Sequence, residues 1–137
     1  MHASEEANNK FVSNISKVPS LKSTVKNAYL AVAEMASAQY KFSPVSKFSI
    51  FNSGKKKLEK AVSEDINSLE IRYIRLSVQK HVPFFLGYNK NIVSDKTFII
   101  QNLKSLKSKD QELFIIISAF LIKNFHLTEL ELQAIKI

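Results

Sequence analysis

The chain has 137 residues, and its 20 Lys and Arg outnumber 12 Asp and Glu, which gives a formal net charge of +8. A hydrophobic fraction of 45% excludes a disordered chain, and the length suits a single domain without disulfide or metal support. The absence of Cys excludes thiolate nucleophiles and Cys-ligated metals, and only two Gly argue against Gly-rich phosphate loops. We therefore predict one small, basic, helical domain over residues 1–137.

The first 20 residues carry balanced charge and end in Val18-Pro19-Ser20, so we expect a partly flexible segment before the helical body. This segment lacks the charged-then-apolar order of a signal peptide. The cytoplasm is therefore the default compartment, with export as the alternative if a leader has been removed. The longest apolar stretch, residues 113–122, is too short for a membrane span, which needs about 20 residues.

The first predicted helix runs from Ser20 or Ser23 to about Tyr40, because apolar residues recur there at helical spacing. Pro44 disfavours helix before it, so residues 41–47 are predicted as a loop, followed by a helix over about 46–65. Gly54 costs this second helix about 1 kcal/mol relative to Ala, which makes sense if a neighbouring helix crosses there. The obvious partner is the Ala-rich stripe of the first helix, formed by Val25, Ala28, Tyr29, Val32, Ala33, Ala36 and Tyr40.

The second helix should turn Phe48, Phe51, Leu58, Ala61 and Val62 inward. After this helix, capping signals mark where the remaining helices begin. A capping box at residues 67–70 starts a third helix to about Lys80, and a fourth follows Ser94. Residues 108–111 cap a fifth helix that is apolar nearly all round and should be central, and a capping box at 128–131 opens a last short helix. With no convincing strand, we predict an all-α fold of five to six helices in antiparallel hairpins.

Two segments are similar to the paired helices of a tetratricopeptide repeat. The spacing Tyr29-x2-Val32-Ala33-x2-Ala36 resembles the first helix, and Gly54-x3-Leu58-x2-Ala61 resembles the second. The chain departs from the repeat where Ile66 replaces the usual Pro, in its longer interhelical loop, and in having no second clean copy.

The wider stretch from 42 to 100 resembles a family of small, uncharacterised bacterial helical proteins. The similarity rests on Pro44, Lys47-Phe48, Phe51-Asn52-x-Gly54-Lys55, Leu58-Glu59-Lys60-Ala61, Glu70-Ile71-Arg72-x-x-Arg75, Pro83-x-Phe85-Leu86-Gly87-Tyr88 and Asp95-Lys96. It covers most of the chain after residue 28. The resemblance implies a tetratricopeptide-like (TPR-like) helical bundle and implies no activity.

The only two arginines, Arg72 and Arg75, share one helix face with Gln79 at spacing i, i+3, i+7. Such a pair could clamp a carboxylate or phosphate of a partner. The alternative is a set of intramolecular bridges that tie neighbouring helices together. Their acceptors would be Glu34, Glu59, Glu64 or Asp95.

The segment Pro83–Tyr88 is unusually apolar for a loop. Phe84, Phe85 and Tyr88 could form a contact surface for a partner, since aromatic side chains dominate binding energy at interfaces. The alternative is a loop that folds back to plug the end of the bundle, because large exposed apolar patches are uncommon.

The positive charge lies in two runs. Residues 41–60 hold six Lys and one Glu, and residues 80–109 hold six Lys and one Asp. Both runs lack Arg, the residue that reads nucleic-acid bases bidentately.

His2, His81 and His126 form no metal-binding motif, and no nucleophile has a catalytic setting. We expect no enzyme activity, no cofactor and no metal.

These observations favour an interaction module that binds an unknown protein or peptide. Its candidate anchors are Tyr29, Tyr73 and Tyr88, with Arg72 and Arg75 orienting the partner segment in a groove between helices. The alternative is an electrostatic binder of nucleic acid or acidic surfaces through the lysine runs. The sequence does not specify the oligomeric state.

Overall fold

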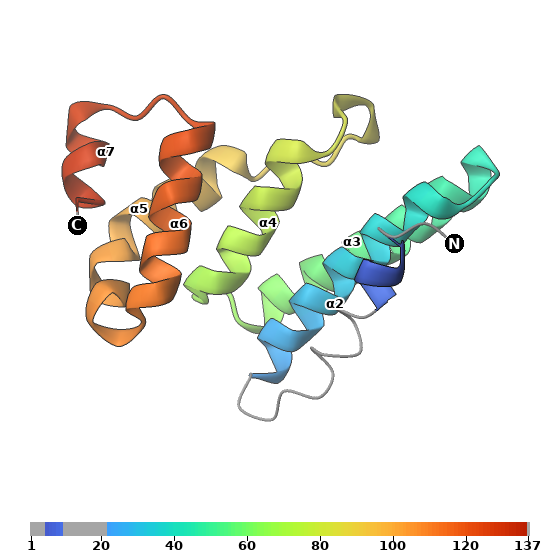
Figure 1. Cartoon of the computed structure of the whole chain (residues 1–137), viewed down its shortest axis with the longest axis horizontal. Helices are drawn as coiled ribbons and strands as arrows, with labels where there is room; N and C mark the ends of the chain where they lie inside the picture. The colour runs from blue at the N-terminus through green and yellow to red at the C-terminus, as the bar shows by residue number, and fades with distance from the viewer. Residues whose placement is uncertain (1–4, 10–21, 137) are drawn as a thin grey trace. The chain divides into compact units, whose positions relative to one another are not determined.

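A computed structural model describes residues 5–9 and 22–136 of the chain, and no strand occurs in these ranges (Figure 1). The all-α class is therefore confirmed. The predicted count of five to six helices is not confirmed, because residues 5–9 are helical in addition to α2–α7. The elements are α2 (Ser23–Ser37), η1 (Ala38–Tyr40), α3 (Pro44–Glu64), α4 (Leu69–His81), η2 (Phe84–Leu86), α5 (Ile92–Lys109), α6 (Gln111–Asn124) and α7 (Glu129–Ala134), where η marks a short 3-10 helix.

The chain forms two compact units, residues 1–74 and 75–137, and their boundary falls within α4. The single domain over residues 1–137 stays a prediction. The predicted flexible segment 1–20 lies outside the described residues apart from 5–9.

The first unit is built on the antiparallel pair α2 and α3 (Figure 1). Gly54 lies at their crossing, where an added Cβ would stand 2.5 Å from Met35 Cγ and 2.8 Å from the Ala31 carbonyl oxygen. The predicted crossing at Gly54 is thus confirmed. The buried face of α2 is rotated from the predicted stripe, since Tyr29, Val32, Ala36 and Tyr40 are only half-buried. Its buried residues are Val25, Ala28, Ala31, Ala33 and Met35.

The start of α3 differs from the prediction. The Ser43 hydroxyl accepts a hydrogen bond from the Ser46 amide at 3.1 Å, and Pro44 occupies the first turn, where its missing N–H is not needed. The helix therefore begins before residue 46. Phe48, predicted to face inward, is 54% exposed.

The register of the hairpin explains the exposure of Phe48. Asp65 follows α3 and accepts a hydrogen bond from the Thr24 hydroxyl at 3.2 Å, which aligns the end of α3 with the start of α2. Because α3 has 21 residues and α2 has 15, the surplus lies at the N-terminal end of α3. Every residue from 41 to 49 is exposed.

The second unit packs α5, α6 and α7 around a core of Ile99, Leu103, Phe114, Ile117 and Leu121. The predicted capping box of α7 is confirmed, with the Glu131 amide donating to Thr128 Oγ1 at 3.2 Å and the Thr128 amide to Glu131 Oε1 at 2.9 Å.

Two predictions about the helices of this chain are wrong. Helix α6 is not central on all sides, because Ile115, Ile116 and Ile122 are about half exposed at 45%, 47% and 57%. The cap of α4 lies one residue later than predicted, because the Ser68 hydroxyl accepts the Ile71 amide at 3.2 Å. No helix in the described ranges is both long and apolar enough to cross a membrane.

Candidate functional site

Arg75, one of the two arginines predicted to bind a partner, forms a buried ion pair with Asp95. Its Nε donates to Asp95 Oδ2 and one terminal nitrogen donates to Asp95 Oδ1, both at 2.8 Å. The side chains are 6% and 0% exposed. Asp95 also lies in the first turn of α5, where the helix dipole favours a negative charge. The geometry favours the structural alternative for Arg75, since this guanidinium is not presented at the surface.

Gln79 and Tyr88 are also buried, and Gln79 anchors the end of the segment that contains Tyr88. The side-chain Nε2 of Gln79 donates to Asn91 Oδ1 at 3.0 Å, and the side-chain Oε1 of Gln79 accepts a hydrogen bond from the Asn91 backbone amide at 2.9 Å. Asn91 is the residue immediately before α5, so these bonds fix the junction between the loop and that helix. Tyr88 is 2% exposed. The two hydrogen bonds from Gln79 therefore hold the end of the loop in place.

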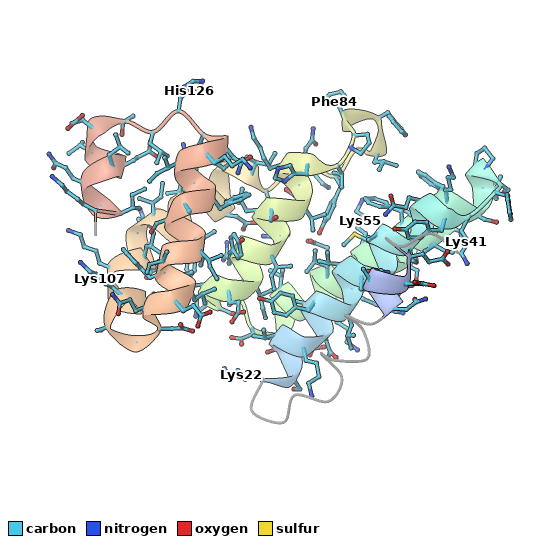
Figure 2. The ribbon with its side chains drawn as sticks, viewed as in Figure 1. Lys22, Lys41, Lys55, Phe84, Lys107 and His126 are labelled. Carbon is cyan, nitrogen blue, oxygen red and sulfur yellow. The ribbon has the colours of Figure 1, made fainter. Side chains whose placement is uncertain are left out.

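The loop that these contacts anchor presents two phenylalanines to solvent. Phe84 and Phe85 are 84% and 82% exposed, and Figure 2 shows Phe84 on the loop that follows α4. They sit on η2, which closes with the Gly87 amide donating to the Phe84 carbonyl at 3.0 Å. Gly87 has φ of 66°, a conformation that favours glycine, and ends the turn. Tyr88 is buried, as the plug alternative expects, whereas Phe84 and Phe85 are exposed, as a contact surface would require.

Three further candidates, Arg72, Tyr29 and Tyr73, belong to the first unit. Arg72 Nε donates to the Ile66 carbonyl at 3.0 Å, which ties α4 to the turn before it. Tyr29 and Tyr73 are half-buried. The Tyr29 hydroxyl donates to Glu70 Oε2 at 2.6 Å, so it joins α2 to the first turn of α4.

The Tyr29–Glu70 contact makes the stability of the fold sensitive to alkaline pH. Burial raises the pKa of Tyr29, and the hydrogen bond to Glu70 and the charge of that carboxylate raise it further. An unfolded Tyr loses its proton at about pH 10. The stability that Tyr29 adds to the fold is therefore fully present below that pH, and it is lost progressively as the pH rises from there toward the higher pKa of the folded state. We expect Tyr29→Phe to unfold at lower urea than the wild type at neutral pH, and to lose less stability between about pH 9 and about pH 11. Equal losses in urea titrations of the two proteins would contradict this assignment.

The lysine run on α3 is partly neutralised within its own unit. Lys57 Nζ lies 2.6 Å from Glu34 Oε2, and Lys60 Nζ lies 3.7 Å from Glu64 Oε1. Burial acts to raise the pKa of Glu34, but the hydrogen bonds from Lys57 and Ser53 outweigh it and lower that pKa below its usual value. These two lysines therefore add less to an external electrostatic surface than the sequence suggests.

An open, mainly apolar cavity of about 520 Å³ lies between α6 and α7. Sequence reasoning missed it. Ser118 is among its lining residues, and among the described residues the Ser118 hydroxyl has no hydrogen-bond partner although it is buried. The only signal was that Ser118 interrupts the longest apolar run. The other lining residues include Ile115, Ile122, Leu132 and Ile135.

The described residues contain no group of three or more His, Asp or Glu side chains that could hold a metal ion. Comparison with protein-family models, with curated proteins and with solved structures finds no match for this chain. The absence of enzyme activity and the family resemblance therefore stay predictions.

Proposed function

We propose that this chain is a non-enzymatic protein-interaction module with tetratricopeptide-like hairpins, and that Phe84 and Phe85 anchor its partner. The observation that carries the proposal is the high exposure of these two adjacent aromatic side chains on an anchored turn. Exposed aromatic residues at a fixed position suit hot spots, because little conformational entropy is lost when a pocket closes over them.

The anchoring of the loop supports a defined binding geometry. Tyr88, which follows η2 in the sequence, is buried, and Gln79 holds Asn91 through two hydrogen bonds. A partner would therefore meet Phe84 and Phe85 in one arrangement rather than ordering them on binding. In this proposal Arg75, Gln79 and Tyr88 position the loop and do not contact the partner.

The charge around the loop indicates the kind of pocket that would receive it. Residues 80–94 contain Lys80 and Lys90 and no Asp or Glu. Both lysines are exposed. Complementary charge favours a partner with an apolar pocket whose rim carries carboxylates.

The small residues at the α2–α3 crossing support the tetratricopeptide-like part of the proposal. Gly54 approaches the Ala31 carbonyl closely enough to exclude a side chain, as two-helix repeats require at their crossing. The hairpin joins its helices through η1 and residues 41–43.

The double variant Phe84→Ala/Phe85→Ala tests the proposed function. A protein captured on the wild-type chain should bind the variant at least about tenfold more weakly in a calorimetric titration, because two hot-spot side chains are lost. The melting temperature should stay nearly unchanged, since exposed substitutions alter stability by less than about 0.5 kcal/mol.

The matched control is Phe42→Ala, which removes an exposed phenylalanine from the first unit and should leave the captured protein's affinity unchanged. If the double variant binds that protein as tightly as the wild type does, the loop is not the binding surface and the proposal is wrong.

A further inference from the structure

A second apolar surface lies at the end of the α2–α3 hairpin, in the unit that does not contain the loop of Phe84 and Phe85. We call residues 41–49 the hairpin tip; all nine are exposed. Phe42 is fully exposed, and Val45 and Phe48 are 79% and 54% exposed. Figure 2 shows Lys41 at this end of the hairpin. Three large apolar side chains are thus exposed at this end of the hairpin.

The apolar and basic side chains of the hairpin tip are arranged on different sides of α3. Val45 and Phe48 are three residues apart in a helix, so they share one face, and Phe42 precedes the same helical turn. Lys47 lies between them in sequence and projects from another side of the helix, and Lys41 flanks Phe42. An apolar point with amines beside it is the pattern of a segment that lies at a membrane interface.

The charge of the surrounding sequence favours an extended anionic surface. Residues 35–58 contain five Lys and no Asp or Glu, and of these lysines Lys57 is paired with Glu34 just outside this stretch. Lys41 and Lys47 lie at the tip, and Lys56 lies more than two turns further along α3. Attraction spread over this length fits a lipid surface better than the rim of one protein pocket, while insertion limited to the tip fits the shallow apolar layer below lipid headgroups.

Nucleic acid fits the same observations less well. It offers no apolar layer for Phe42, Val45 and Phe48, and the hairpin tip has no Arg for bidentate recognition of bases. We infer that the hairpin tip inserts Phe42, Val45 and Phe48 into the interface of a bilayer that contains anionic lipid, with Lys41 and Lys47 at the lipid phosphates. This inference is independent of the proposed protein partner, because it uses other residues in the other unit.

The test uses the full chain and sedimented vesicles. One set of vesicles is phosphatidylcholine alone, and the other is an equal mixture of phosphatidylcholine and phosphatidylglycerol. We expect binding to the mixed vesicles only, weakened by added salt because surface charge is screened. Phe42→Ser/Phe48→Ser should lower the partition coefficient at least about tenfold, since two apolar side chains no longer insert. The matched control Phe84→Ser/Phe85→Ser should bind like the wild type.

A fluorescence measurement separates insertion from surface attraction. The chain has no Trp, so Phe42→Trp introduces a single reporter. Its emission should shift to the blue with the mixed vesicles, whereas that of Phe84→Trp should not.

Several outcomes would overturn the inference. These are no sedimentation with the mixed vesicles, an unshifted Phe42→Trp emission, or equal loss of binding in the two serine variants. If duplex DNA displaces the chain from mixed vesicles, and if Phe42→Ser/Phe48→Ser weakens DNA binding as much as vesicle binding, the tip is assigned to nucleic acid. Self-association that disappears in that variant would assign the tip to a contact between copies.

Discussion

Replacing Asp95 by Asn should lower the free energy of unfolding by about 3–5 kcal/mol, the largest effect we expect from one exchange in this chain. Asn has nearly the same shape as Asp but no charge, so the Arg75 guanidinium would stay buried without its counterion. The cost arises from the uncompensated buried charge rather than from a lost contact. Urea unfolding followed by circular dichroism measures it.

Two further variants separate this explanation from a general sensitivity to charge removal. Glu64→Gln removes the carboxylate of the exposed Lys60–Glu64 pair, and it should cost less than about 1 kcal/mol. Arg75→Met/Asp95→Leu removes both buried charges and should recover most of the stability lost in Asp95→Asn, because well-packed apolar residues can replace a buried ion pair. A loss in Asp95→Asn no larger than that in Glu64→Gln would contradict the assigned role of the pair.

The ion pair also changes how the two arginines can be tested for function. Arg75→Ala would remove the guanidinium that pairs with the buried Asp95, so any loss of partner binding would be mixed with unfolding. Arg72 is half-buried and its Nε is bonded to the Ile66 carbonyl, which makes its replacement less disruptive. Only Arg72→Ala can therefore test whether a guanidinium on α4 contributes to binding.

The local features of the fold were predictable because they depend on neighbouring residues. The capping box at Thr128 and Glu131 needs only four consecutive residues, and it forms as predicted. The exposure of Phe48 was not predictable from periodicity. It depends on the register of α3 against α2, which is set by the contact of Thr24 with Asp65 far along the chain.

The candidate site follows the same division. The spacing of Arg72, Arg75 and Gln79 correctly placed them on one helix, but their partners come from separate segments. Asp95 was one of four possible acceptors for an arginine, and sequence alone could not choose among them. The exposure of Phe84 and Phe85 was equally open, because hydrophobic composition favours burial, and of the three aromatic residues in this loop only Tyr88 is buried.

Replacing Gly54 by Ala should destabilise the chain by about 1–3 kcal/mol, although Ala is the better helix former. In an open helix the exchange would stabilise by about 1 kcal/mol. Here the new Cβ would stand 2.5 Å from Met35 Cγ and 2.8 Å from the Ala31 carbonyl oxygen. Met35 can change rotamer, but the Ala31 backbone can move only if α2 and α3 separate. The steric cost therefore exceeds the gain in helix propensity, which urea unfolding would measure.

A matched control and a partial rescue test whether close contacts of the added Cβ cause the loss of stability in Gly54→Ala. Ser49→Ala changes an exposed residue of the same helix and should alter stability by less than about 0.5 kcal/mol. In the background of Met35→Ala, the further exchange Gly54→Ala should cost less than in the wild type, because the contact with the Met35 side chain is gone and only the backbone atoms of Ala31 and residue 35 remain close. A Gly54→Ala variant more stable than the wild type would show that the two helices are not held at this distance, and the tetratricopeptide-like crossing would lose its support.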